Sequence, residues 1–181
     1  MKIIAFTGPG GAGKNTAAEA LGTQWHTNEV AFTTPLYDMA AAALGITPEQ
    51  VNQLKQQGDK AIRALLEQLG DAVRNTIRPD YLIVRLVDTL RELEDSQDTP
   101  ELAVITDLRT EEEASWVRAM RGHVIHVNRP EGTSTSQHST NQPITMEQGD
   151  GYLLNAGTVE DLHKEAINAV RAALQGKQVA A

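Results

Sequence analysis

Short apolar runs alternate with stretches of helical spacing along this chain of 181 residues. Each run is nearly continuous in its apolar residues, which is typical of strands that helices cover on both faces. The pattern predicts strands at 2–7, 30–34, 102–106 and 123–127, and a weaker one at 152–154. Strands that alternate with helices build an α/β fold, here three layers with a central, mostly parallel sheet.

Helix-start signals support the helical intervals. Thr47-Pro48-Glu49-Gln50 combines an N-cap, a proline in the first turn and a capping-box partner. Further helices are predicted at 59–75, 79–94, 110–121 and 158–174, the last capped by Thr158 with Asp161 following.

We expect one domain over residues 1–181, with two additions. The stretch 36–96 is a helical insertion between the second and third strands, at the carboxyl edge of the sheet where such folds bind ligands. The polar stretch 131–142 is rich in Ser, Thr, Asn and Gln. It is either a lid-like loop or a solvated connection.

The most specific chemical signal follows the first strand. Residues 8–16 read G-P-G-G-A-G-K-N-T before an alanine-rich helix, which is the pattern of a phosphate-binding loop. Its glycines let backbone N–H groups point inward, and Lys14 can reach the β- and γ-phosphates of a nucleotide. Asn15 stands where a Ser or Thr usually ligates Mg²⁺, and the hydroxyl comes one residue later, at Thr16.

A second signal ends the third predicted strand. Asp107 follows the apolar run and Arg109 comes two residues later. An aspartate at this position can hold Mg²⁺ through water, and an arginine can clamp a phosphate. The alternative is that Asp107 caps the next helix and that Arg109 lies at the surface.

The insertion offers basic residues for a second, phosphate-bearing substrate. They are Lys55, Lys60, Arg63, Arg74 and Arg78. Each alone also fits a solvated helix face, but we expect at least one to contact substrate. Arg63 and Arg74 are about three α-helical turns apart, so they can share one face.

Composition limits the partners. The formal net charge is −8, which argues against a nucleic-acid partner, because proteins that grip nucleic acid carry basic surfaces. The chain has no cysteine, which excludes disulfides and fits a reducing cytoplasm. No apolar run approaches the ~18 residues of a membrane span. We therefore expect a cytoplasmic protein without a membrane partner, and a homodimer is one option for its assembly.

Together the motifs resemble nucleoside monophosphate kinases, and more closely the deoxynucleoside monophosphate kinases of tailed bacteriophages. Besides the loop, the resemblance rests on A-F-T-T-P-L (31–36), V-I-T-D-L-R (104–109), R-A-M-R-G-H-V-I-H-V-N-R-P (118–130) and N-A-G-T-V-E-D-L (155–162). It implies a P-loop kinase fold that uses ATP and Mg²⁺. It also implies phosphoryl transfer to a deoxynucleoside monophosphate for DNA synthesis, in the host cytoplasm if the chain is phage-encoded.

The resemblance also implies roles for individual residues. The ATP phosphates would be held by Gly11, Ala12, Gly13, Lys14, Asn15 and Thr16. Asp107 and Arg109 would serve the Mg²⁺ and phosphate region, with Thr16 as a second metal candidate. Asn155 and Gly157 would lie near the adenine. The acceptor pocket would be lined by Thr33, Pro35 and Leu36. Either Arg63 or Arg74 would orient the acceptor: Arg63 lies in a stretch (62–70) that resembles the family's arginine-bearing helix, whereas Arg74 is a candidate from its charge alone.

Departures from the family pattern keep some alternatives open. Asn15 replaces the aspartate usual in the phage enzymes, Tyr37 stands where a lysine often follows Pro-Leu, and the insertion is shorter. The base preference therefore does not transfer. Other acceptors are a phosphorylated metabolite or a modified base in DNA. A nucleotide-binding switch is a third hypothesis, although the chain has no N-K-x-D tetrapeptide for guanine.

Overall fold

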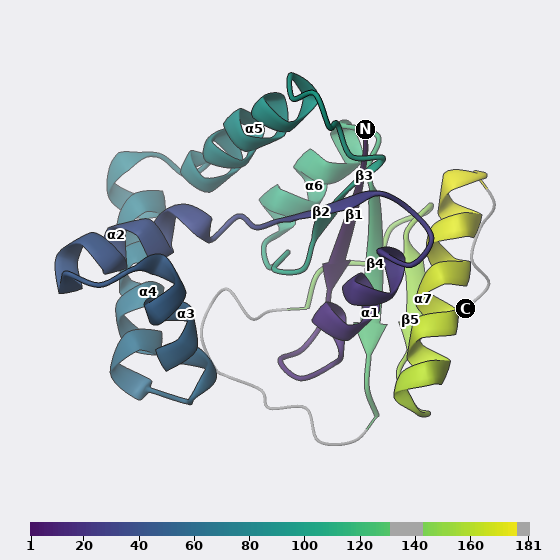
Figure 1. Ribbon diagram of the computed structural model, residues 1–181, viewed down its shortest axis with the longest axis horizontal. Helices are drawn as coiled ribbons and strands as arrows, with labels where there is room; N and C mark the ends of the chain where they lie inside the picture. Colours follow the sequence, from purple (N-terminus) through teal and green to yellow (C-terminus); the bar gives the residue numbers. More distant parts are fainter. Residues whose placement is uncertain (131–142, 177–181) are drawn as a thin grey trace. The chain divides into compact units, whose positions relative to one another are not determined.

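The first apolar run forms β1 (Lys2–Thr7), the middle strand of a parallel sheet in this computed structural model (Figure 1). The strand order is β2-β3-β1-β4-β5, and every pair of neighbours is parallel. The other strands are β2 (Thr27–Val30), β3 (Leu102–Ile105), β4 (His123–Asn128) and β5 (Gly151–Leu154). The predicted α/β class with a mostly parallel sheet is confirmed.

The structure describes residues 1–130 and 143–176, and the chain forms two compact units. Unit 1 comprises Met1–Ala31 and Leu90–Ala181 and contains the sheet. Unit 2 comprises Phe32–Thr89. The predicted lid-like loop at 131–142 lies outside the described residues.

Helices cover both faces of the sheet in unit 1 and produce three layers. α1 (Lys14–Leu21) and α7 (Val159–Leu174) lie on one face and against each other, and α6 (Glu111–Ala119) lies on the other (Figure 1). Small side chains fill the α1–α7 contact, among them Ala17, Ala18, Ala166 and Ala169. Because the distance between two helices depends on the side chains between them, this contact is close. The packing of α1 against α7 fixes the position of the first turn of α1, which directly follows the loop after β1.

The second strand differs from its prediction. The sequence pattern predicts residues 30–34, whereas β2 covers Thr27–Val30. β2 is an edge strand whose first three residues are polar, so apolar periodicity could not find it. The apolar Phe32 that suggested a strand is buried in unit 2, and Pro35 already lies in the first turn of a helix.

Helix starts follow the predicted caps. Capping boxes form between Thr47 and Gln50, and between Thr158 and Asp161. In each box the threonine hydroxyl accepts a hydrogen bond from the third helical N–H, and the partner side chain accepts one from the threonine N–H. These local signals are confirmed because they need no partner from elsewhere in the chain.

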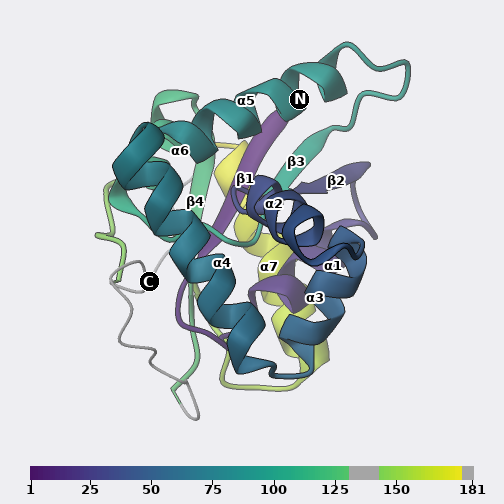
Figure 2. The same ribbon diagram turned by 90° about the vertical axis from the view of Figure 1, so that its left-hand side faces the viewer.

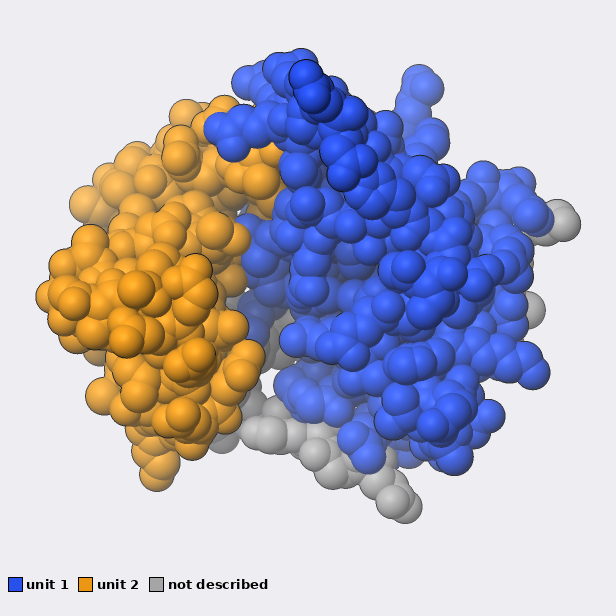
Figure 3. All heavy atoms as spheres, viewed as in Figure 1, with its two compact units in different colours: residues 1–31, 90–181 blue, residues 32–89 orange. Residues whose placement is uncertain are grey.

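Unit 2 is helical, and the sequence pattern did not predict the range of its first helix. α2 (Thr34–Leu44), α3 (Pro48–Gln56) and α4 (Lys60–Ala72) pack on one another, as Figure 2 shows. Leu36, Val51 and Ile62 are buried in this unit. The π-helix η1 (Val73–Ile77) continues α4, and α5 (Tyr81–Glu94) follows it and ends in unit 1. Figure 3 colours the atoms of the two units.

The π-helix changes the spacing that suggested a shared face for Arg63 and Arg74. Eleven residues equal about three turns only in a regular α-helix. α4 ends at Ala72, and the Arg78 N–H reaches the Val73 carbonyl across the wider turn. The α-helical spacing therefore does not describe the relation between the two arginines. π-helical turns occur often at functional sites.

A hydrogen-bonded hub ties the segment before β5 to the sheet in unit 1. The Arg118 guanidinium donates to both carboxylate oxygens of Asp150, at 2.6 and 3.1 Å, and to Glu147 at 2.7 Å. The His126 ring nitrogen lies 3.0 Å from Asp150, whose side chain is only 3% exposed. Burial opposes ionisation of Asp150, but hydrogen bonds from Arg118, the Glu147 N–H and His126 outweigh it and keep its pKa below the ordinary value.

We expect Arg118→Met to lower the free energy of unfolding by about 3 kcal/mol, because it leaves the buried Asp150 carboxylate without its main partner. Urea unfolding monitored by circular dichroism measures this change. Arg171→Met is the control: it removes an arginine from the exposed face of α7 and should cost less than about 0.5 kcal/mol. Equal losses in the two variants would show that the hub contributes nothing specific.

None of the described helices combines the length and the apolar character needed to cross a membrane.

Candidate functional site

Glycine makes the loop after β1 sterically feasible. Gly8 has φ 138°, and a Cβ at this residue would lie 2.1 Å from the Val127 carbonyl oxygen of β4. No side chain fits there, so the loop passes directly over the neighbouring strand. Gly13, the residue before α1, has φ 102°. The two positive φ values turn the chain from the end of β1 into the first turn of α1, where free N–H groups can bind an anion.

Asn155, which follows β5, forms a hydrogen bond to the backbone of the loop. Its Nδ2 donates to the Ala12 carbonyl at 2.9 Å, and its own N–H donates to the Asn128 carbonyl at 2.7 Å. A Cβ on Gly13 would lie 2.6 Å from Asn155 Nδ2. The asparagine after β5 therefore shapes the phosphate-binding loop, a role that depends on contacts between distant parts of the chain and that sequence reasoning did not assign to it.

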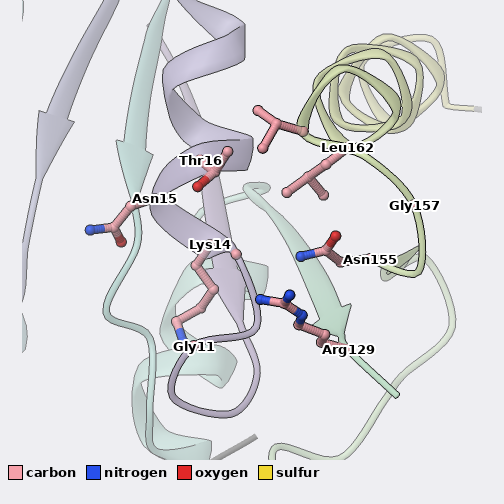
Figure 4. A pocket seen from close by; sticks show the side chains of 10 residues that line it. Gly11, Lys14, Asn15, Thr16, Arg129, Asn155, Gly157 and Leu162 are labelled. Atoms are coloured by element: carbon pink, nitrogen blue, oxygen red, sulfur yellow. The ribbon is translucent and has the colours of Figure 1, made fainter. Parts of the chain in front are cut away.

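The loop, the end of β4 and the start of α7 enclose a pocket of about 400 Å³ in unit 1 (Figure 4). Seven of the residues expected to bind nucleotide line it: Gly11, Gly13, Lys14, Asn15, Thr16, Asn155 and Gly157. Ala12, the eighth, is fully buried and supplies the carbonyl that Asn155 binds. Val159 and Leu162 add an apolar side. Figure 4 shows the Asn15 side chain on the opposite side of α1 from Asn155.

Lys14 lies inside the loop and binds its backbone. The Nζ atom donates to the Gly8 carbonyl at 2.8 Å and to the Pro9 carbonyl at 2.9 Å. Burial, and to a smaller extent the Arg109 charge, lower the pKa of Lys14 from 10.5 to about 8, against an opposing effect of the Asp107 charge. The loop therefore holds a cation whose solvation is poor, which favours an anionic ligand.

Asp107 and Arg109 follow β3 and belong to the electrostatic environment of Lys14. Thr110, and not Asp107, is the N-cap of α6. The buried Glu113 carboxylate accepts from the N–H groups of Arg109 and Thr110, at 2.9 and 3.1 Å. The capping role considered as the alternative for Asp107 is thus taken by other residues, and Glu113 holds the backbone that carries Arg109.

Arg129 is a pocket residue that sequence reasoning missed. It follows β4 immediately and lines the pocket with Lys14 and Asn155. In Figure 4 its guanidinium points toward the loop. Its position in N-R-P (128–130) becomes informative once β4 is known to lie beside β1, since the carboxyl ends of neighbouring parallel strands lie at the same edge of the sheet as the loop.

Two side chains expected near the loop, Thr16 and Asp107, could supply oxygen ligands to a metal ion that keeps most of its bound water. Among the described residues, no group of three or more His, Cys, Asp or Glu side chains could hold a metal ion by itself. Thr16 and Asp107 offer one hydroxyl and one carboxylate. Mg²⁺ bound with phosphates takes few protein ligands of this kind.

The predicted acceptor residues all belong to unit 2. Thr33 is the N-cap of α2, Pro35 lies in its first turn and Leu36 is buried. The structure brings Leu36 and Arg74 together at Gly70, where an added Cβ would lie 3.4 Å from Leu36 Cδ1 and 3.0 Å from Arg74 Nη1. Arg63 is exposed and donates to the Lys55 carbonyl at 3.3 Å.

Comparison with known proteins finds a family match that includes residues of both units. A family model described as deoxynucleotide monophosphate kinase matches residues 42–166. The chain is 32% identical over 106 residues to the deoxynucleotide monophosphate kinase of Escherichia phage RB69, covering 58% of this chain and 43% of that protein. It is 28% identical over 123 residues to that of Enterobacteria phage T4, covering 67% and 49%. The chain thus matches about half the length of these curated relatives.

Among solved structures, the shikimate kinase of Aquifex aeolicus vf5 is similar at 13% identity and a TM-score of 0.45, covering 96% of this chain and 99% of that chain.

The family match covers more than half of the chain and extends through both units. It includes Asp107, Arg109, Arg129 and Asn155, four of the residues described above. The phosphate-binding loop precedes the matched stretch, but the hydrogen bond from Asn155 to Ala12 joins the two in one site. The chain belongs to the deoxynucleotide monophosphate kinase family.

Proposed function

We propose that this chain transfers the γ-phosphoryl group of ATP to the 5′-phosphate of a deoxynucleoside monophosphate and so forms the diphosphate. The observation that carries the proposal is the phosphate-binding loop of unit 1, with the poorly solvated Lys14 inside it. Family membership supports the class of acceptor. The phage relatives support a place in the cytoplasm of an infected host.

The residues of the pocket in unit 1 would bind ATP, the phosphoryl donor. The N–H groups of the loop and the first turn of α1 bind the phosphates, and Lys14 exchanges the Gly8 and Pro9 carbonyls for phosphate oxygens. Arg109 and Arg129 offset further negative charge. The apolar side chains of Val159 and Leu162 offer a surface for the base. Asn155 acts through the loop, by keeping the Ala12 carbonyl turned away from the phosphates.

Thr16 and Asp107 would hold Mg²⁺, Asp107 through water. When bound, the ion would neutralise negative charge on the transferred phosphoryl group. Asn15, which replaces the usual hydroxyl beside Lys14, takes no part in this.

On the acceptor side, Thr33, Pro35 and Leu36 would contact the nucleotide, and Arg63 or Arg74 would hold its phosphate. The acceptor phosphate is already an anion, so no side chain needs to remove a proton. Catalysis then comes from positioning and from charge neutralisation. Cations and backbone N–H donors, which the described residues supply, suffice for such a reaction.

A coupled kinase assay tests the proposal. ATP is offered with each natural deoxynucleoside monophosphate, dCMP included, and with hydroxymethylated analogues. Phosphorylated metabolites and duplex DNA serve as competing acceptors. We expect at least one monophosphate to accelerate ADP release by about a hundredfold or more over ATP alone. Slow hydrolysis that no acceptor accelerates would favour a nucleotide-binding switch.

The pKa of Lys14 predicts how nucleotide affinity changes with pH. The phosphates favour the charged ammonium, so binding raises this pKa above its free value of about 8. Between pH 8 and the bound pKa, binding then requires uptake of a proton, and we expect the Kd of ATP to rise by about tenfold per pH unit.

Isothermal titration with ATP in EDTA, from pH 7.5 to 9.5, measures this dependence without the metal. Lys14→Ala is the control, because its weaker affinity should lack the same rise. Parallel pH profiles for the two proteins would assign the titration to another group.

A further inference from the structure

The Tyr37 phenol contacts Lys55, one of the basic residues of the insertion, between the start of α2 and the end of α3. Tyr37 lies in the first helical turns of α2, directly after Leu36, and Lys55 lies in the last turn of α3. The Lys55 Nζ donates a hydrogen bond to the Tyr37 hydroxyl. Both side chains are partly buried, which is uncommon for a lysine. The packing of α2 against α3 therefore holds the pair in place.

The pair has hydrogen-bond donors to spare. The Lys55 nitrogen, which donates to the Tyr37 hydroxyl, lies 5.2 Å from the centroid of the Tyr37 ring. The tyrosine oxygen accepts this bond, so its own O–H can donate to another group. An ammonium carries three N–H donors, and Tyr37 takes one of them. A ligand that contacts both groups must therefore offer several acceptors.

No carboxylate neutralises Lys55 within the described ranges. None of the ion pairs formed by the described residues includes Lys55. Arg63 adds a second cation, because its Nη2 donates to the Lys55 backbone carbonyl. A partly buried ammonium without a counter-ion loses solvation, and an anionic ligand offsets that loss.

We propose that Tyr37 and Lys55 form a phosphate-binding pair that holds the 5′-phosphate of the acceptor nucleotide, with Arg63 beside it. This inference rests on the proposed function. A phosphate has three oxygens that accept hydrogen bonds from several donors at once, which matches the donors of the pair. A sugar hydroxyl or a base edge carries no charge to match the ammonium. Leu36, the residue before Tyr37, packs toward Gly70 and Arg74, so the start of α2 contacts both α3 and α4.

Steady-state kinetics of the full chain test the pair. We expect Lys55→Met to raise the KM of the preferred monophosphate by about tenfold or more and to leave the KM of ATP within about twofold. Tyr37→Phe should raise the acceptor KM by about three- to tenfold. Because the two groups act together, the double variant should show less than the product of the single effects. Arg85→Met, which removes an exposed cation from the same unit, should leave both constants within about twofold.

The unphosphorylated nucleoside separates phosphate binding from a structural role. Its inhibition constant against the monophosphate should be the same in the wild type and in Lys55→Met, because it lacks the group that the pair binds. Inorganic phosphate should inhibit the wild type better than the variant. Lys55→Arg keeps the charge and should retain part of the affinity, while thermal unfolding confirms that each variant is folded.

Three outcomes decide the inference. Selective loss of monophosphate affinity supports it. Equal loss for nucleoside and monophosphate, or effects no larger than those of Arg85→Met, overturns it and leaves the kinase function intact. A wild-type protein that phosphorylates no monophosphate overturns both.

Discussion

Lys14→Ala should abolish phosphoryl transfer and leave the chain folded. We expect kcat/KM to fall by about a thousandfold or more, since the variant removes the cation that faces the transferred phosphate. The wild-type ammonium is poorly solvated, as its lowered pKa indicates, and it donates hydrogen bonds to the Gly8 and Pro9 carbonyls of the loop. None of the ion pairs in the described part of the chain includes Lys14, so the fold should tolerate its loss.

Kinetics and thermal unfolding of Lys14→Ala, measured on one preparation, check both parts of this expectation. Asn15→Ala is the matched control, because it changes the adjacent residue, whose side chain lies on the side of α1 opposite to Asn155 (Figure 4). This control should keep most of the activity. A folded Lys14→Ala protein with wild-type rates would contradict the proposed function.

Gly8→Ala should destabilise unit 1 by about 3 kcal/mol or more. Its φ of 138° is unfavourable for any residue with a Cβ, and that Cβ would lie 2.1 Å from the Val127 carbonyl oxygen. Backbone of a central strand cannot move aside as a flexible side chain can. The loop must therefore shift away from β4, which displaces the N–H groups that bind phosphate. We expect nucleotide binding to be lost at temperatures where part of the protein is still folded.

Gly11→Ala separates steric collision from positive φ alone. Gly11 has φ 79° in the same loop, but a Cβ there would have no neighbour within 4 Å. Its cost should be only about 1 kcal/mol, the penalty of the left-handed conformation. Urea unfolding of the two variants measures the difference. A loss for Gly8→Ala no larger than that for Gly11→Ala would show that the loop does not pass over Val127 as described.

The sequence predicted those parts of the fold that depend on residues close together along the chain. The end of β1, the turn of the phosphate-binding loop and the caps at Thr47 and Thr158 depend on residues within a few positions of one another. The range of β2 was predicted wrongly, because its polar residues lie at the edge of the sheet and its position is set by pairing with β3. The π-helix that carries Arg74 likewise has no sequence signal that spacing alone reveals.

The candidate site residues also differ in whether their roles depend on sequence neighbours or on distant parts of the chain. Lys14 could be predicted because its neighbours in sequence define its role. Arg129 and Asn155 could not be assigned to the loop from sequence, because β4 must first be placed beside β1, and β5 beside β4, for either residue to reach it. Tyr37 was noticed only as a departure, since its partner Lys55 lies on the next helix.

The direct test of the kinase proposal is transfer of the γ-phosphate itself. ATP labelled at the γ-position is incubated with the protein, Mg²⁺ and each deoxynucleoside monophosphate in turn, and the products are separated by chromatography. We predict that the label moves to at least one monophosphate and elutes with its diphosphate, and that Lys14→Ala forms no such product. Label that appears only as inorganic phosphate with every monophosphate would contradict the account.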